Sequence, residues 1–200
     1  MQENKSKNTK SQILSASLKL FSEKSYHGGS IRDIAKSIGK RESSIYNHFS
    51  SKEEILSSIV SNFTNRNFGK IILTDELINL ISKPEKFFLM LGLNLIDFWK
   101  SDNERMFIKI LIDTNSLEKI KLNYSLNFYL NDFRKLTEFI FEEMIKHKFI
   151  RKSDVSILSR EYLSPLFMLF LETSLDNSTK MDLKVNIKNH IEFFWKAIKR

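Results

Sequence analysis

Hydrophobic residues recur at helical spacing along most of this 200-residue chain, and no apolar–polar alternation runs long enough to indicate a strand. Two prolines and five glycines leave few breaks between these segments. The pattern predicts an all-α chain with helices over about 9–24, 51–69, 83–100, 102–114, 117–147, 154–176 and 181–199. Two shorter helices are expected within 30–50 and a helical turn at 75–81, after ten polar residues that we expect to be disordered.

The segment from Ser30 to Lys52 has the pattern of two short helices joined by a tight turn. The apolar residues at 31, 34, 35 and 38 fall on one helix face. Ser30 stands where an N-cap accepts a backbone N–H. Gly39 follows the last apolar position, where a left-handed conformation costs glycine little. The spacing therefore predicts a helix–turn–helix.

The second helix of this segment is apolar on one side only. Ile45 and Phe49 are its clear core anchors. Its other side carries hydrogen-bonding groups at Arg41, Glu42, Ser43, Tyr46, Asn47 and His48. A helix that is half committed to a core and half polar is what reading base edges in a major groove requires.

These residues resemble the N-terminal domain of the TetR (tetracycline repressor) family over about residues 9–60. The matching residues are Ile13, Ala16, Phe21, Tyr26, Ser30–Ala35, Gly39, Ile45–Phe49 and Ser51–Ile55. The resemblance covers about a quarter of the chain closely, and the rest agrees in length and helical character. It implies a three-helix DNA-binding domain over 1–52 and a larger helical domain for ligand binding and dimerisation over 53–200.

The resemblance implies a set of DNA contacts within the first domain. The residues assigned to DNA binding are Ser30, Arg32, Lys40, Arg41, Ser43, Ser44, Tyr46, Asn47, His48 and Lys52. Tyr46, His48 and Lys52 match the backbone-contacting positions, whereas Asn47 and Ser43 can present groups to bases. The alternatives are a buried Tyr46 ring, a capping or packing role for His48, and a solvated Arg32.

Three positions depart from the family pattern. Ser25 replaces the glycine that commonly ends the first helix, so we expect strain at that turn. Lys40 occupies a usually apolar position, and Arg41 stands where Ser or Thr usually caps the recognition helix. Both cations favour phosphate contact but repel the positive N-terminal end of that helix.

The net charge of +8 is concentrated on the proposed DNA-binding domain. Residues 1–52 hold ten Lys or Arg against four Asp or Glu, a net of +6, while 53–200 hold 22 against 20, a net of +2. This is the electrostatic footprint of a phosphate-binding surface, with an ordinary lysine-rich surface as the alternative.

The composition argues against several other classes of protein. With no cysteine, disulfides and thiolate metal sites are excluded. The longest apolar run, Phe87–Trp99, is shorter than the roughly 20 residues of a membrane span, and the N-terminus has no apolar signal region, so we expect a cytoplasmic protein. The four histidines are scattered, and no catalytic constellation or glycine loop emerges, so we expect neither an enzyme nor a cofactor or metal.

The C-terminal part is rich in aromatic and aliphatic residues, which in the resembling family surround a small-molecule cavity. The residues assigned to a ligand are Phe88, Leu91, Asn94, Leu95, Phe98, Phe107, Phe128 and Phe139. Ordinary core is the alternative for each. Asn94 and Asp97 share a helix face and could orient a ligand, join two helices or face solvent.

The last two helices resemble the pair that associates across the family's two-fold axis. The residues assigned to this interface are Phe167, Phe170, Ile187, Ile191, Phe194, Trp195 and Ile198, with intramolecular core as the alternative. Pro165 is expected to kink its helix. The resulting hypothesis is a homodimeric repressor that a small apolar ligand releases from a near-palindromic double-stranded DNA operator. The alternative is a ligand-independent helical DNA-binding protein that acts in chromosome organisation or through a protein partner.

Overall fold

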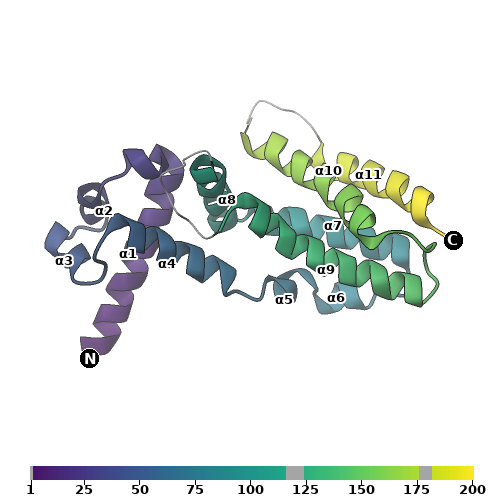
Figure 1. Ribbon diagram of the computed structural model, residues 1–200, viewed down its shortest axis with the longest axis horizontal. Helices are drawn as coiled ribbons and strands as arrows, with labels where there is room; N and C mark the ends of the chain where they lie inside the picture. The colour runs from purple at the N-terminus through teal and green to yellow at the C-terminus, as the bar shows by residue number, and fades with distance from the viewer. Residues whose placement is uncertain (1, 116–123, 176–181) are drawn as a thin grey trace. The chain divides into compact units, whose positions relative to one another are not determined.

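The computed structural model describes residues 2–115, 124–175 and 182–200, and it confirms the all-α prediction. The described residues form helices without a β-strand, and one isolated antiparallel bridge joins Ile150 to Lys199 (Figure 1). The predicted helix over 117–147 is observed from Leu126 to Lys146, and residues 117–123 of that prediction lie outside the described residues. The ends of the predicted last two helices at 176 and 181 also lie outside them.

The chain divides into two compact units. Unit 1 contains α1 (Gln2–Gly28), α2 (Ile31–Ser37), α3 (Glu42–Tyr46), α4 (Lys52–Thr64) and α8 (Asp102–Asn115). Helix α1 packs against α2, α4 and α8, so it forms the centre of this unit. The largest fully buried side chains of unit 1 belong to Ile13, Phe21, Ile34, Ile45, Phe49 and Phe107.

Unit 2 contains α5 (Phe68–Ile72), α6 (Asp75–Ile78), α7 (Pro84–Lys100), α9 (Leu126–Lys146, from Phe128 on), α10 (Val155–Leu175) and α11 (Leu183–Ile198). Helix α7 packs against both α10 and α11, which also pack against each other. Its core is aromatic: the Phe88 ring centre lies 5.2 Å from that of Phe141 and 5.6 Å from that of Tyr162. The buried Tyr162 hydroxyl donates to the Phe88 carbonyl at 2.6 Å, which ties α10 to α7.

Several boundaries differ from the prediction. The first helix begins at Gln2, so the expectation of ten disordered residues was wrong. Helix α4 ends at Thr64 rather than near Gly69, because Asn65 forms its C-cap and Asn67 caps the separate helix α5. The expected turn at 75–81 is present as α6, and Pro84 occupies the first turn of α7.

The packing of the chain does not follow the predicted boundary after residue 52. Unit 1 extends to Arg66 and also takes in α8, because α8 packs on α1 and Phe107 stacks on Phe63 with ring centres 4.0 Å apart. The assignment of 1–52 to DNA binding and 53–200 to ligand and dimer functions stays a prediction.

Candidate nucleic-acid interface

The turn between α2 and α3 is set by Gly39. This residue has a φ of 64°, as its position after the last apolar residue predicted. The Gly39 N–H donates to the Lys36 carbonyl at 3.2 Å and the Lys40 N–H donates to the Ala35 carbonyl at 2.9 Å. These two bonds form a complete Schellman motif, which ends α2 sharply and starts the chain toward α3.

Helix α2 begins with a reciprocal cap. The Ser30 hydroxyl oxygen accepts the Asp33 N–H at 3.1 Å, and the Asp33 carboxylate accepts the Ser30 N–H at 3.1 Å. The Ser30 hydroxyl also donates to this carboxylate at 2.6 Å. These hydrogen bonds from Ser30 hold the pKa of the Asp33 carboxyl below its usual range. Ser30 therefore fixes the start of α2, as the N-cap prediction required.

Helix α3 is anchored on one side only. Ile45 and Phe49 are fully buried, whereas the Tyr46 ring is 53% exposed, so the alternative of a buried Tyr46 does not hold. Arg41 precedes α3 without a side-chain capping bond, as its sequence predicted. Of the residues assigned to DNA, Ser30, Arg32, Lys40, Arg41, Ser43, Tyr46 and Asn47 are exposed, while Ser44, His48 and Lys52 are half-buried.

Lys52 is bound within the protein more firmly than the sequence suggested. Its ammonium donates to the Tyr26 carbonyl at 2.8 Å and to the Gly29 carbonyl at 2.9 Å. The same group lies 4.3 Å from the centre of the Tyr26 ring, a favourable cation–π position. Burial, and after it the Glu53 carboxylate, raises the pKa of the Tyr26 hydroxyl well above its usual range. Lys52 thus fixes the junction between α1 and α2, whatever it does with DNA.

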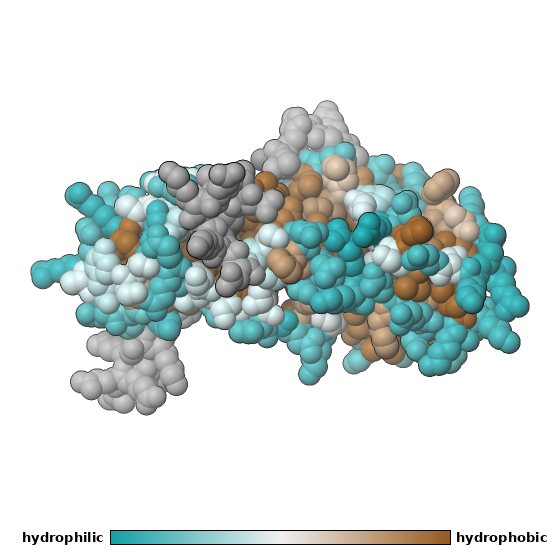
Figure 2. Space-filling model, viewed as in Figure 1, coloured by the Kyte–Doolittle hydropathy of each residue, from teal (hydrophilic) through white to brown (hydrophobic). Residues whose placement is uncertain are grey.

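The exposed cations of this region are not neutralised inside the protein. Arg32, Lys40 and Arg41 are exposed, and none of them pairs with a carboxylate among the residues that the structure describes. On the face in Figure 2, the surface over α2 and α3 is mainly hydrophilic. This arrangement leaves positive charge available for phosphates.

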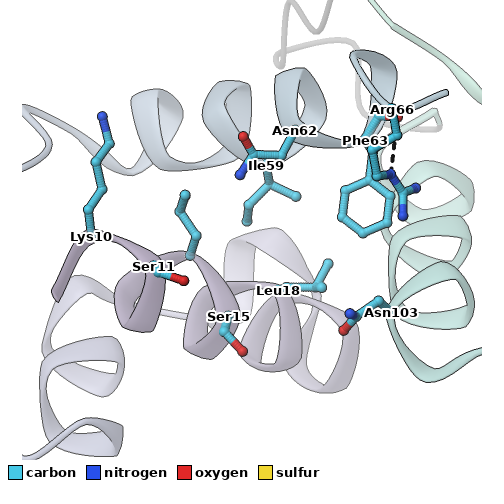
Figure 3. A pocket seen from close by; sticks show the side chains of 10 residues that line it. Lys10, Ser11, Ser15, Leu18, Ile59, Asn62, Phe63, Arg66 and Asn103 are labelled. Carbon is cyan, nitrogen blue, oxygen red and sulfur yellow. Dashed lines mark hydrogen bonds between the residues drawn. The ribbon is translucent and has the colours of Figure 1, made fainter. Parts of the chain in front are cut away.

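A groove of about 460 Å³ runs between α1 and α4 within unit 1. Leu14, Leu18, Ile59 and Phe63 provide its apolar part, with polar groups at its edges (Figure 3). The Arg66 guanidinium at one end donates to the Phe63 carbonyl and pairs with the buried Glu104 carboxylate. The Lys10 ammonium at the other end lies 5.2 Å from the Phe49 ring centre. None of the residues assigned to DNA or ligand lines this groove.

The residues assigned to a ligand are not brought together. Phe88, Leu91 and Leu95 are fully buried in the core of unit 2, and Phe107 lies in the core of unit 1. Phe128 and Phe139 are exposed, and Phe98 is nearly buried. The Asn94 amide donates to the Ile72 carbonyl at 2.8 Å, so it joins α7 to α5, while Asp97 is exposed. Of the eight, only Phe139 lines a pocket described in unit 2; sequence reasoning missed the other residues of that pocket, because they come from segments far apart in the sequence, 73–87 and 140–149.

Most of the residues assigned to the dimer interface are buried within the chain itself, and their assignment to the interface stays a prediction. Phe167, Phe170, Ile187, Ile191, Phe194 and Ile198 are buried within unit 2, and Trp195 is half-buried. The exposed apolar residues of the same two helices are Ile157, Met168, Val185 and Phe193. Since α10 and α11 lie side by side (Figure 1), these four residues are the apolar material available for a partner.

Other site types find no support in the described part of the chain. Within residues 2–115, 124–175 and 182–200, no three His, Cys, Asp or Glu side chains gather as a metal site. Over the same ranges, no helix combines the length and apolar composition needed to cross a bilayer.

Comparison with known proteins agrees with this geometry. Residues 13–59 match the family model described as bacterial regulatory proteins, tetR family. The biofilm operon icaADBC negative transcriptional regulator IcaR of Staphylococcus epidermidis is 27% identical over 164 residues, which cover 82% of this chain and 80% of IcaR.

Two solved structures share the fold at low identity. NalD, the secondary repressor of the MexAB-OprM multidrug efflux pump in Pseudomonas aeruginosa, superposes with a TM-score of 0.65 at 20% identity and covers 98% of both chains. The SmeT–triclosan complex superposes with a TM-score of 0.68 at 15% identity and covers 96% of this chain and 92% of SmeT. The matched helix–turn–helix, the similarity to IcaR over about four-fifths of both chains and the shared fold lead to one conclusion: residues 13–59 form a DNA-binding domain of the tetR family of bacterial regulatory proteins, and the chain is a DNA-binding transcriptional regulator.

Proposed function

We propose that this protein is a homodimeric repressor that binds a near-palindromic operator through α3 and is released by a small apolar ligand. The observation that carries the proposal is the division of α3, whose Ile45 is fully buried while Tyr46 and Asn47 stand exposed beside Arg41. A recognition helix fixed by its core side can present the other side to a major groove. Because operator DNA lies in the cytoplasm, the proposal includes a cytoplasmic location and a non-enzymatic role.

Two kinds of contact are expected from this surface. Arg32, Lys40 and Arg41 bring positive charge toward phosphates, which supports affinity without sequence preference. Asn47 and Ser43 offer an amide and a hydroxyl to base edges, which supports specificity. In a dimer, two copies of α3 meet successive major grooves, so the operator shares the two-fold symmetry of the protein.

Selection of bound sequences from random DNA tests this function. A two-fold symmetric motif is expected, whereas binding without sequence preference would contradict operator recognition. Asn47→Ala is expected to change the selected sequence at one position of each half-site. If the variant instead loses affinity equally on all sequences, Asn47 contacts the backbone.

Two lysine variants separate phosphate contact from structural support. Lys40→Ala is expected to reduce the slope of log K against log salt by about one unit and to leave thermal stability unchanged, because Lys40 is exposed. Lys52→Ala is expected to lower the melting temperature as well, since its ammonium joins the Tyr26 and Gly29 carbonyls. An unchanged salt slope for Lys52→Ala would remove this residue from the DNA contacts and leave it only the structural role.

Ligand release distinguishes the proposal from its alternative. SmeT, which shares the fold, forms a complex with triclosan, and this supports a small-molecule response here. A ligand that lowers operator affinity must itself bind more weakly in the presence of operator DNA, by the same factor. A regulator whose operator affinity responds to no small molecule would instead favour the ligand-independent alternative.

A further inference from the structure

A pocket of about 180 Å³ opens on unit 2 between α6, the start of α7 and the second half of α9. Its floor is formed by buried side chains of Phe87, Ile140 and Met144. Its rim is formed by Ile78, Ile81 and Phe139, which are 49%, 50% and 59% exposed. Exposed apolar groups that converge on one hollow are unusual on a protein surface and commonly mark a binding site.

The polar groups of the pocket are confined to one side. Glu143 lies in the last turn of α9 and His147 directly follows this helix, with the His147 Nε2 atom 3.6 Å from the Glu143 carboxylate. Lys146 donates to the same carboxylate at 3.0 Å. The negative charge of Glu143 is therefore balanced locally, and the pocket offers no net charge to offset that of a buried ion. The carboxylate oxygens can still accept a further hydrogen bond.

The size of the pocket limits its occupant. An apolar cavity of roughly 150 Å³ is large enough to hold benzene. A pocket of about 180 Å³ with an open rim therefore suits one aromatic ring or two fused rings. A charged molecule would lose its hydration without finding an opposite charge, which is costly.

We propose that this pocket binds an uncharged one- or two-ring aromatic molecule whose single hydrogen-bond donor, an O–H or N–H, is accepted by Glu143. The site shares only Phe139 with the residues that the family resemblance assigned to a ligand, and Phe88, Leu91 and Leu95 of that set lie fully buried in the core. The claim that this pocket regulates DNA binding rests on the proposed function. The claim that it binds such a molecule does not, and it is tested in the absence of DNA.

Titration of the full chain with matched probes tests the site by ligand-observed NMR. Phenol and indole are expected to bind saturably and to displace each other. Benzoate and benzamidine, which carry opposite charges on the same ring, are expected to bind about tenfold more weakly or not at all. Toluene is expected to bind more weakly than phenol, and Glu143→Leu is expected to abolish this difference. The absence of saturable binding by phenol and indole would overturn the proposal.

Rim variants show whether the probes occupy this pocket. Ile78→Trp covers the opening and Phe139→Ser removes part of the rim, and both positions are exposed enough to tolerate the change. Both are expected to lose phenol binding at least about fivefold. Ile71→Ser is the matched control, because Ile71 is 55% exposed, close to the 59% of Phe139, and lines neither the pocket nor the proposed dimer face. Binding to both rim variants as to the unmodified protein would overturn the assignment.

Two further measurements separate the possible failures. If Phe139→Ser changes the sedimentation mass while no probe binds, the rim is a protein interface and the proposal fails. If operator binding is intact but no probe binds, the pocket assignment fails and the repressor function stands. If the probes bind but no operator is selected, the repressor function fails and the pocket stands.

Discussion

Ser25 adopts a backbone conformation that non-glycine residues rarely accept. Its φ of 63° and ψ of 165° fall in a region that is essentially restricted to glycine, where another residue costs about 1–3 kcal/mol. The serine stands where the family pattern has glycine, and the structure confirms the strain expected at the end of the first helix. The turn persists because the side chain of the next residue, Tyr26, is buried and the Tyr26 carbonyl accepts a hydrogen bond from the Lys52 ammonium.

Ser25→Gly is therefore expected to stabilise the protein by about 1 kcal/mol. Urea denaturation measures the effect. Ser15→Gly is the matched control, since Ser15 is an exposed residue within regular α1 and glycine there costs up to about 1 kcal/mol. The two substitutions are chemically identical, so opposite signs would isolate the backbone strain. A destabilising Ser25→Gly would show that the serine hydroxyl matters more than the strain.

His190 links stability to pH at a single side chain. Its ring is half-buried with Nε2 3.3 Å from the Tyr162 carbonyl, and burial lowers its pKa below the usual 6.5. Above pH 6.5 the His190 ring is mainly neutral in both the folded and the unfolded state. As the pH falls below this value, the unfolded chain binds a proton at a higher pH than the folded protein does. Stability is thus expected to fall as pH drops from 7.5 to 5.5, by at most about 1.4 kcal/mol per pH unit.

Urea midpoints at the two pH values check this expectation. The carboxyl groups with lowered pKa, such as Asp33, do not lose their charge in this window, because they titrate below their usual values. His190→Gln should remove the slope while keeping a donor for the Tyr162 carbonyl. His147→Gln, at an exposed histidine, should retain it. An unchanged slope in His190→Gln would assign the proton to another group.

At the scale of the helices, the sequence predicted local features well. The cap at Ser30 and the turn at Gly39 depend on neighbours within four residues, and both are confirmed. Contacts between distant segments were missed. The carbonyl partners of Lys52 lie 26 and 23 residues away, and the packing of α8 on α1 joins segments still farther apart. No local pattern encodes such pairings.

Substitutions in the Arg66–Glu104 ion pair test how much the association of α8 with the rest of unit 1 contributes to stability. Glu104 on α8 is 1% exposed, and the guanidinium that faces it comes from the segment after α4. Arg66→Ala is expected to cost about 1–3 kcal/mol, less than for a fully buried pair because Arg66 is about one-third exposed. Glu104→Gln in the same background should recover part of the loss, since a neutral amide needs no counter-charge.

Arg105→Ala provides the control for this element. Arg105 pairs with Asp102 on the same helix, but both side chains are more than half exposed. Such a pair contributes at most about 0.5–1 kcal/mol. Thermal melts of the four proteins decide between the two cases. Equal costs for Arg66→Ala and Arg105→Ala would mean that the contact between α8 and the end of α4 contributes little.

At the scale of the whole molecule, the assignment of α10 and α11 to the dimer stays a prediction, and the sequence alone did not identify the outer face of these helices. Both faces of α11 carry apolar residues, so periodicity alone could not distinguish Phe194, which is 5% exposed, from Phe193, which is 75% exposed. The packing of α11 on α7 decides which face is internal. On the face in Figure 2, brown hydrophobic side chains gather over unit 2, consistent with apolar surface left for a partner.

Substitution by aspartate is therefore expected to disrupt the dimer at Phe193 and the fold at Phe194. Phe193→Asp is expected to give a folded monomer at micromolar concentration, because it puts a charge into the proposed interface and leaves the core intact. Phe194→Asp is expected to unfold unit 2, since it buries a charge beside Phe88 and Tyr162. Ile71→Asp, at an exposed isoleucine on α5, should change neither property. Sedimentation equilibrium and circular dichroism distinguish the three outcomes.

The dimer prediction also has a consequence for DNA binding. Two linked DNA-binding domains bind a symmetric operator far more tightly than one, because the second domain binds at a high effective concentration once the first is bound. Phe193→Asp should therefore weaken binding to the full operator by about 100-fold or more, while a DNA that carries one half-site is bound as by the unmodified protein. Titrations of both DNAs by fluorescence anisotropy measure the two affinities. Equal losses of affinity for the full operator and for the half-site DNA would mean that Phe193 supports the fold of the DNA-binding domain rather than the pairing of subunits. A Phe193→Asp protein that remains dimeric with full operator affinity would place the interface away from the exposed face of α10 and α11.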